Sequence, residues 1–501
     1  MATAILNRTR SSSVLPIVVI VTMAVFAALL FGLLVPFVGP YVGGGLAVMI
    51  AGAAIATSRL TLAWSALFIG IVVSGLAQLY LPQYAVVRWL IPLASWALVL
   101  HVMSQVFSRE RNPVRFPQEF IWVFLLFVFA LFSALVNWRG TVGFVQGAKL
   151  YFQLWGLMIG LALLPWNPKS LDRFLVFFFL VAMIQLPFAL HQYIYIVPER
   201  YGLWMYGVVP LDVVSGTFGA DRLGSGKNMV LSAFLVLVFS FLVALWKSGA
   251  IRAWYLIFSA PILLVPVFLN ESKYASLMLA FSMFMLYRKD VVKRPVQALV
   301  MACATAALLA GLLTTYATQF GQGRTIEETL QYIIDTNFGT AGYGKSLLNR
   351  VTAITFWAEK HGLDNLPETL VGHGLGSAHD TAESYLSSVK SLATTQYAGY
   401  GIGLTSFSML LWDIGLLGFS LVCLVFWSFF RAASRLSDAY KSDPWRHGVF
   451  EGMQVALFCC FMMIPHNGAF AVDAVFQTLV FFVFGYIAYW SLRHRRVAAG
   501  A

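Results

Sequence analysis

The stretch Leu347–Gly376 reads LLNRVTAITFWAEKHGLDNLPETLVGHGLG, and it lies within residues 318–403, the one long polar segment of the sequence. On both sides of that segment the sequence consists of apolar runs joined by short connections. Of the 501 residues, 60% are hydrophobic and 11% are charged. The mean hydropathy is +0.79. A soluble domain cannot bury so much apolar surface, so the sequence predicts an all-α, polytopic membrane helix bundle with a partly helical extracytoplasmic loop.

A helix needs roughly 20 apolar residues to cross the hydrocarbon core of a bilayer. By this criterion the sequence predicts about 14 transmembrane helices. They lie near residues 14–36, 41–57, 60–80, 84–107, 118–136, 142–164, 171–196, 228–246, 252–269, 273–287, 296–317, 404–430, 447–465 and 470–491. This divides the chain into an N-terminal transmembrane region (1–317), an extracytoplasmic segment (318–403) and a C-terminal transmembrane region (404–501). We expect the first apolar run to be a retained helix and not a cleaved signal peptide.

The positive charge predicts how the helices are oriented. The net charge is +12, and the basic residues sit at every second connection between spans. Because cytoplasmic connections are enriched in lysine and arginine, both termini are predicted to be cytoplasmic. Charge spread over short loops is not the footprint of a nucleic-acid-binding face. The four cysteines lie in apolar runs, which predicts neither a disulfide framework nor a metal site.

Two larger connections fall on the predicted outer side, and the first spans residues 198–227. Its end reads DRLGSGKN, with Arg222 and Lys227 at the membrane surface just before a span. An arginine fork and glycine N–H groups ahead of a helix suit a phosphate group. The alternative for Arg222 is contact with lipid headgroups. Lys273, at an outer turn, either joins the same basic pocket or pairs with Glu271.

The second outer connection is the long polar segment. Helices are predicted at residues 325–335, with Thr325 as N-cap, at 345–361, with Arg350 in the N-terminal half, and at 381–390. Gly372, Gly374 and Gly376 predict a turn, which either binds an anion through its N–H groups or is a plain turn. Among the charged residues within spans, Lys149 and Asp413 are open to an interpretation as interhelical pairs.

Two histidines on the outer side are candidate general bases. His373 lies inside the glycine cluster, and His466 lies on the hairpin between the last two spans. An imidazole has a suitable intrinsic pKa for taking a proton from a sugar hydroxyl. Most loop histidines do no chemistry, so neither residue is assigned by its position alone.

Three motifs together resemble bacterial O-antigen polymerases and O-antigen ligases. Arg222-Leu223-Gly224 with Asn228 resembles the first arginine motif of that family, and Arg350 with Trp357 and the glycine cluster resembles the second. Asp413-Ile414-Gly415-Leu416-Leu417-Gly418 resembles the start of the helix that follows the large outer loop. The resemblance covers residues 215–425. Where the ligases carry a histidine–asparagine pair ahead of Gly415, this sequence has Leu404-Thr405, and the difference favours a polymerase.

The resemblance implies a metal-independent glycosyltransferase without a cofactor. It would act on the periplasmic side of the bacterial inner membrane, with an undecaprenyl-pyrophosphate-linked glycan as donor. Arg222 and Arg350, with Lys227 and Lys273, would bind the pyrophosphate. Partners would be membrane lipid and a flippase and chain-length regulator of the same pathway. Three alternatives remain: an O-antigen ligase, a flippase or transporter of lipid-linked oligosaccharide, and a structural partner in an envelope complex.

Overall fold

The computed structural model describes residues 58–107, 116–206, 208–270, 272–288, 346–379 and 391–498, with scattered residues between 295 and 343. The chain divides into two compact units, Met1–Ala63 and Trp64–Ala501, and the account below concerns the second. Every regular element in the described residues is a helix, apart from one isolated bridge between Ala220 and Gly226. The predicted all-α class is therefore confirmed for this part of the chain.

The helices follow most of the predicted spans. In chain order they are α4 (Arg59–Phe68), η1 (Ile69–Val73), α5 (Ser74–Tyr80), η2 (Pro82–Trp89), α6 (Leu90–Phe107), α7 (Phe120–Val136), α8 (Gly140–Phe152), α9 (Trp155–Leu163), α10 (Pro168–His191), η3 (Gln192–Ile196), α11 (Val197–Arg200), η4 (Tyr201–Tyr206), η5 (Pro210–Val213), α12 (Asn228–Lys247), α13 (Ala253–Leu269), α14 (Lys273–Tyr287), α18 (Thr352–His361), α19 (Leu366–Val371), α20 (Ser406–Ala439), α21 (Pro444–Met463), α22 (Ala469–Val472) and α23 (Ala474–Ala498).

Six helical segments in the described residues are long and apolar enough to cross a membrane. They are Arg59–Tyr80, Pro82–Phe107, Pro168–Leu203, Asn228–Lys247, Ser406–Ala439 and Ala474–Arg496. Three shorter apolar helices, α7, α13 and α14, match further predicted spans. The spans predicted at 14–36 and 41–57 lie outside the described residues, as does that at 296–317 apart from scattered positions. The protein is therefore membrane-embedded, while the number of 14 spans stays a prediction.

The span predicted at 142–164 is wrong as a single helix, because the structure divides it into α8 and α9. The N–H of Gln153 closes α8 by donating to the carbonyl of Lys149. The N–H of Leu157, in the first turn of α9, donates to the hydroxyl of Ser95 at 2.8 Å. The same N–H also donates to the carbonyl of Leu154 at 3.1 Å, so the Ser95 hydroxyl is a second acceptor, from a neighbouring helix, at the start of α9. Apolar content alone does not reveal such a break.

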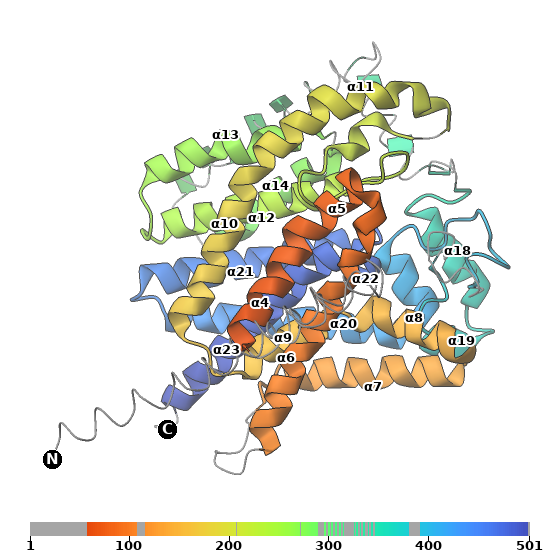
Figure 1. Cartoon of the computed structure of the whole chain (residues 1–501), viewed down its shortest axis with the longest axis horizontal. Coiled ribbons are helices and arrows are strands. Elements are labelled where there is room, and N and C mark those ends of the chain that lie inside the picture. The colour runs from red at the N-terminus through yellow and green to blue at the C-terminus, as the bar shows by residue number, and fades with distance from the viewer. Residues whose placement is uncertain are drawn as a thin grey trace, which may run out of the picture. The chain divides into compact units, whose positions relative to one another are not determined.

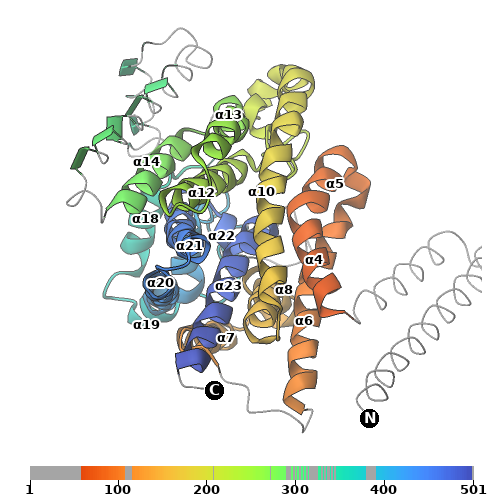
Figure 2. The ribbon, with the colours of Figure 1, turned by 90° about the vertical axis from the view of Figure 1, so that its left-hand side faces the viewer.

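The core of the unit lies around α23, whose apolar window is fully buried. Figure 2 shows α23 between α10 on one side and α20 and α21 on the other. Helices α12 and α21 pack closely through two glycines of α21, since a Cβ at Gly452 would meet the ring of Phe241 at 2.5 Å and one at Gly448 would meet Leu245 at 3.0 Å. Small residues at an interface let membrane helices approach each other.

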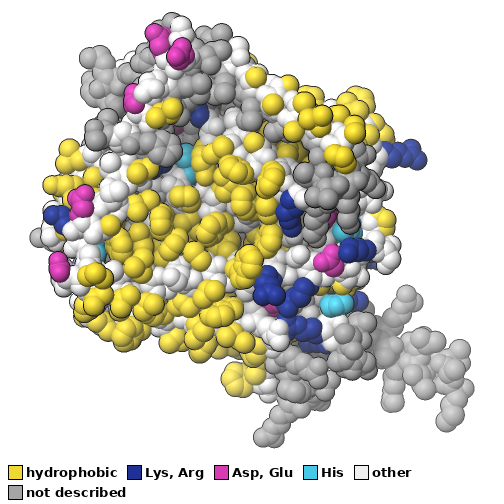
Figure 3. Space-filling model, turned by 180° about the vertical axis from the view of Figure 1, so that it is seen from behind, with side chains coloured by type: hydrophobic (Ala, Val, Ile, Leu, Met, Phe, Trp, Pro, Cys, Tyr) yellow, Lys and Arg dark blue, Asp and Glu magenta, His cyan; other side chains and the backbone are white. Residues whose placement is uncertain are grey.

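The bundle has two ends, and different elements lie at each of them. In Figure 1, α11, α18, α19 and α22 lie at the right-hand end of the long helices, while the C-terminal end of α23 lies at the left. Figure 3 shows apolar side chains over the middle of one face and lysine and arginine side chains gathered at one edge. Basic residues predicted to be cytoplasmic pair with acidic residues of other helices or connections: Arg435 bonds Glu119 at 3.1 Å and Arg446 bonds Asp172 at 2.6 Å. Which end faces the cytoplasm stays a prediction from the loop charges.

The first outer connection enters the bundle and is held there by two buried glutamines. The side-chain oxygen of Gln192 accepts from the N–H groups of Ser215 and Gly216 at 3.0 and 2.8 Å. Gln185 exchanges two hydrogen bonds with Thr217, at 2.8 and 2.9 Å. Because irregular backbone at membrane depth must be paired, these side chains allow the connection to lie inside protein. They fix the segment that leads to Arg222 and Lys227.

The outer segment differs from its prediction at one important point. Helix α18 begins at Thr352, so Arg350 precedes it, and the predicted helical position of Arg350 is wrong. The reason is local: the side chain of Asn349 accepts from the N–H groups of Val351 and Thr352 and starts the helix there. The predicted capping role of Thr325 is confirmed, because Thr325 and Glu328 exchange hydrogen bonds at 2.7 and 3.2 Å. The helix predicted at 381–390 lies outside the described residues.

Candidate functional site

The outer hairpin that joins α21 to α23 (464–473) is the meeting point of two distant connections. Arg350, from the long outer segment, donates from Nε to the backbone carbonyl of His466 at 2.7 Å. The Arg350 guanidinium also lies over the ring of Tyr343, 4.2 Å from its centroid. Two of the residues that the sequence singled out are thus neighbours, although they are 116 positions apart. The fixed Nε and the aromatic ring hold the planar guanidinium in one orientation.

Lys227, from the first outer connection, reaches the same hairpin. Its ammonium lies 2.8 Å from the carboxylate of Asp473, and both side chains are mostly buried. The residue that follows, Asn228, is tied to the next outer turn, because it and Asn270 each donate to the backbone carbonyl of the other, at 3.1 and 3.0 Å. The first outer connection is therefore in contact with both the turn at Asn270 and the final hairpin.

Lys273 and Tyr274 open α14 beside this surface. The ring of Tyr274 stacks on the ring of His466, with centroids 4.0 Å apart and planes 5° apart. The Tyr274 hydroxyl donates to the carbonyl of Met462 at 2.8 Å. Burial and the nearby Arg350 guanidinium hold the pKa of His466 well below its usual range. His466 is thus a neutral imidazole at neutral pH, and the lowered pKa makes it a weaker base than a free imidazole.

Arg222 and Lys227 both belong to the first outer connection, but they have different partners. The guanidinium of Arg222 pairs with Glu199 of α11 at 2.9 Å, and both side chains are more than half exposed. An exposed ion pair is weak, and a ligand phosphate can displace the carboxylate. The ion pair of Arg222 is with α11, whereas Lys227 and Arg350 contact the hairpin.

The arginine that organises the Arg222 loop is Arg200, which sequence reasoning missed. It is only 1% exposed. Its guanidinium donates to the carbonyls of Val209, Asp221 and Gly224 at 3.1, 3.3 and 2.5 Å. A guanidinium satisfies several carbonyls at once through its fixed fork of donors. The only signal in the sequence was its position beside Glu199 at a predicted span end.

Replacing Arg200 by alanine should unfold this loop at a lower temperature. Three carbonyls would lose the donor that the buried Arg200 supplies, and we expect the free energy of unfolding to fall by about 2–4 kcal/mol. The measurement is the melting temperature of the full chain in detergent. Arg173→Ala, an exposed arginine on α10, is the matched control and should melt like the wild type. Equal melting temperatures for the Arg200→Ala variant and the control would contradict the prediction.

The glycine cluster is not an open anion site, because its N–H groups bind the chain itself. The N–H of Gly376 donates to the carboxylate of Asp413 at 2.8 Å, and those of His373 and Gly374 donate to the carbonyls of Trp412 and Asp413. The expectation that this turn holds a ligand anion is therefore corrected. The anion that it holds is the carboxylate of Asp413, from α20.

Asp413 joins the turn to the membrane helices through four hydrogen bonds. Its two oxygens accept from the N–H groups of Gly376 and Ala378, the hydroxyl of Ser377 and the hydroxyl of Tyr151, all at 2.7–2.8 Å. Asp413 is therefore a buried carboxylate, and each of its two oxygens accepts two hydrogen bonds.

Helix α20 is kinked at this point to admit the turn. Gly415 has a φ of +63°, which a residue with a side chain rarely adopts. A Cβ at Gly415 would meet the Leu370 carbonyl at 2.5 Å, and one at Gly372 would meet the backbone of Asp413 at 2.6 Å. The glycines are thus required for two backbones to touch. Their presence in the sequence gave no indication of which segment they approach.

Arg139 is a further cation near the glycine turn, and sequence reasoning missed it. It lies in the connection between α7 and α8, close enough to Asp413 and His373 to act on them electrostatically. Burial lowers the pKa of Arg139, and the Asp413 carboxylate partly offsets the effect. The only sequence signal was its place on a short predicted outer connection.

His373 points to His361 and not to the hairpin of His466. The Nε2 atoms of the two rings are 2.8 Å apart, and the ring of His373 stacks on Trp412 with centroids 5.6 Å apart. Burial, His361 and Arg139 lower the pKa of His373 to about 4. Glu368 of α19 completes a group of three possible ligands whose donor atoms lie within 4.8 Å of one another. The two candidate bases therefore have different partners.

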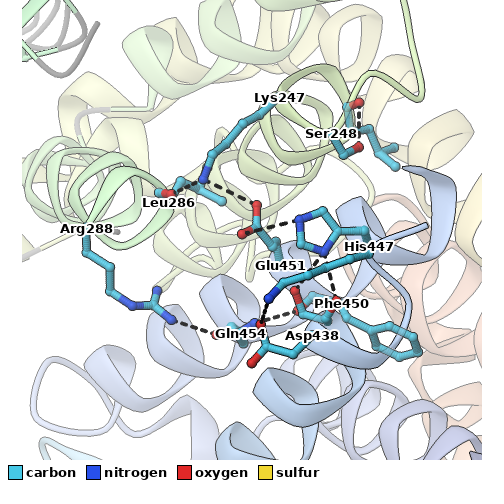
Figure 4. Close-up of polar contacts among 12 residues, drawn as sticks. Lys247, Ser248, Leu286, Arg288, Asp438, His447, Phe450, Glu451 and Gln454 are labelled. Atoms are coloured by element: carbon cyan, nitrogen blue, oxygen red, sulfur yellow. Dashed lines mark hydrogen bonds and ion pairs between the residues drawn. The ribbon is translucent and has the colours of Figure 1, made fainter. Parts of the chain in front are cut away.

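A separate charged network lies at the C-terminal end of α12 and in the N-terminal half of α21, away from the hairpin. In Figure 4 the ammonium of Lys247 lies between the carbonyl of Leu286 and the carboxylate of Glu451, at 2.5 and 3.4 Å. His447 approaches the other oxygen of Glu451 at 3.8 Å, and Arg288 donates to Gln454 at 2.7 Å. Each of these charges has a partner within the network. The network links the predicted cytoplasmic ends of three helices, α12, α14 and α21.

Comparison of the chain with protein-family models finds no match, and comparison with curated proteins finds none either. The candidate site is therefore interpreted from its own residues and geometry. It consists of Arg350, Lys227, Tyr274 and His466 around one outer hairpin, with Arg222 on the adjoining loop surface.

Proposed function

We propose that the protein is a membrane glycosyltransferase that polymerises oligosaccharide repeat units carried on undecaprenyl pyrophosphate. The reaction takes place at the outer face of the bacterial inner membrane and yields O-antigen, capsule or exopolysaccharide. One observation carries the proposal: Arg350 and Lys227, from separate outer connections, both contact the hairpin that holds His466. Two cations beside a neutral imidazole at the end of a membrane bundle suit a lipid-linked pyrophosphate donor.

The cations act on the leaving group. As the bond between the anomeric carbon and the pyrophosphate oxygen breaks, the lipid pyrophosphate takes the bonding electrons and gains negative charge. Fixed positive charges at that position are stronger ligands of the transition state than of the ground state, so they lower the barrier. Arg350 is held by His466 and Tyr343 before any ligand arrives, which reduces the cost of reorganisation. Arg222 and Lys273 are the further phosphate ligands that the sequence predicts.

His466 is the base in this scheme. The acceptor hydroxyl attacks the anomeric carbon and gives its proton to the imidazole. The product is a new glycosidic bond, and the released carrier is undecaprenyl pyrophosphate. His373 was an equal candidate from the sequence, but its ring is engaged with His361 and Trp412.

Two other functions compete with polymerisation. An O-antigen ligase uses the same donor and transfers the glycan to lipid A-core, so the same cations would serve it. A flippase or transporter needs a polar path through the bundle. The network around Glu451 places charge within helices, which is the observation in favour of transport. Its members are paired with one another, however, and the cavity of about 30 Å³ inside the bundle has an apolar lining that includes Phe152, Trp155 and Phe426.

A deletion strain separates the three functions by the glycan that accumulates. Loss of a polymerase leaves a single repeat unit on its lipid carrier or on lipid A-core. Loss of a ligase leaves long polymer on undecaprenyl pyrophosphate. Loss of a flippase leaves single units that an outside enzyme cannot reach. We expect the first result. Mass spectrometry of extracted lipid-linked glycans separates single units from polymer, and cleavage of the single units by a glycosidase added to intact spheroplasts shows whether they are on the outer face. Either of the other two results would overturn the assignment.

A further inference from the structure

Three side chains with metal-binding atoms meet where the long outer segment contacts α20. His361 ends α18, Glu368 lies in α19, and His373 lies in the glycine turn. The two Nε2 atoms are 2.8 Å apart, and a carboxylate oxygen of Glu368 is 4.0 Å from Nε2 of His373. The three donor atoms lie within 4.8 Å of one another. None of the three belongs to the site proposed above.

The surroundings fix the orientation of the two imidazoles. Nδ1 of His361 lies 2.8 Å from the carbonyl of Trp357, so it carries the proton and leaves the lone pair of Nε2 directed at His373. A backbone carbonyl on the distal nitrogen is the usual second partner of a metal-binding histidine. Trp412 packs against both rings, with centroids at 4.7 and 5.6 Å. The pair is therefore held by features that do not depend on the bond between the rings.

The distances are close to those of a metal site. Histidine nitrogens bind zinc at about 2.0–2.1 Å, so two of them lie about 2.9 Å apart at a right angle and about 3.3 Å apart at the tetrahedral angle. The observed 2.8 Å requires the rings to separate by about half an ångström or less. Glu368 is half exposed and can approach by a change of side-chain rotamer. Two imidazoles and one carboxylate leave at least one coordination position open.

We propose that His361, Glu368 and His373 bind a divalent transition-metal ion of the zinc class. The ligands suit a borderline ion better than calcium or magnesium, which prefer oxygen ligands only. The ion would connect the end of α18, α19 and the turn that is bonded to Asp413, and would hold the outer segment on α20. The open position would hold water, and the site assigns His373 a function other than that of the proposed general base. It stands independently of the proposed glycosyl transfer, which takes place at another cluster.

The test is metal binding by the purified full chain in detergent, prepared with an affinity tag that contains no histidine. The protein is treated with a chelator, and zinc chloride is titrated against a chromophoric competitor. The wild type should bind one equivalent, and zinc should raise its melting temperature. Glu368→Gln and His373→Gln should each raise the Kd at least about 100-fold and lose the thermal shift. Both variants are checked for a single size-exclusion peak.

His447→Gln is the matched control, because His447 and Glu451 form a histidine–carboxylate pair of only two ligands at the other end of the bundle. It should bind zinc like the wild type. Three results would overturn the proposal: no binding by the wild type, unchanged binding by both ligand variants, and loss of binding in His373→Gln without loss in Glu368→Gln. The readout is metal content and stability, so polymer synthesis does not enter it.

Discussion

Replacing Arg350 by alanine should reduce polymer synthesis by at least about 100-fold, because an active site that loses a fixed donor to a developing oxyanion typically loses 10²–10³ in rate. The expected phenotype is a single repeat unit without polymer. The measurement is the length distribution of the polysaccharide, with immunoblotting of membranes to show that the variant is present. Arg350→Lys should recover only part of the activity, since an ammonium keeps the charge but cannot bind two phosphate oxygens.

Two further arginines make the experiment specific. Arg431→Ala, an exposed arginine on α20 at the predicted cytoplasmic end, is the control and should leave polymer unchanged. The sequence predicts that Arg222→Ala abolishes polymer as Arg350→Ala does. Full polymer from Arg222→Ala alone would mean that the clamp is formed by Arg350 and Lys227. Full-length polysaccharide in cells that carry Arg350→Ala would show that the pyrophosphate role of Arg350 is wrong.

Replacing Asp413 by asparagine should cost about 3–5 kcal/mol of stability and detach the glycine turn from α20. The carboxylate accepts four hydrogen bonds, two on each oxygen. An amide offers one acceptor oxygen, and its NH₂ group would face two of the existing donors. The melting temperature of the full chain in detergent should fall by several degrees, and polymer synthesis should fall with it.

A graded pair of variants tests whether the network acts as a unit. Ser377→Ala removes one of the four donors and should lower stability by only about 1 kcal/mol. Tyr151→Phe removes another and should behave similarly. A melting temperature of Asp413→Asn equal to that of Ser377→Ala would contradict the assigned role of the carboxylate. It would mean that packing alone keeps the turn on α20.

The resemblance and the spacing identified several residues that do lie together. Arg350 and His466 were selected as separate candidates on one side of the membrane, and the structure places them in contact. Lys227 was selected for its position before a span, and it reaches the same hairpin. The predicted meeting of Arg222 and Arg350 stays a prediction, since Arg222 pairs with Glu199. Residues at the same end of a bundle are confined to a thin layer. Only a few connections at that end are long enough to fold over the helix ends, so the residues they carry lie close to one another.

The sequence by itself determined that this is an all-helical membrane protein and where most of its helices run. A bilayer leaves backbone groups no partner except within a helix, so about 20 apolar residues specify both the structure and its length. Only the tertiary structure decided which polar groups pair: Asp413 with the glycine turn, Arg200 with three carbonyls, and His373 with His361 and not with the hairpin. Those choices depend on how helices distant in sequence pack side by side, and hydrophobic periodicity carries no information about the neighbour that a helix will have.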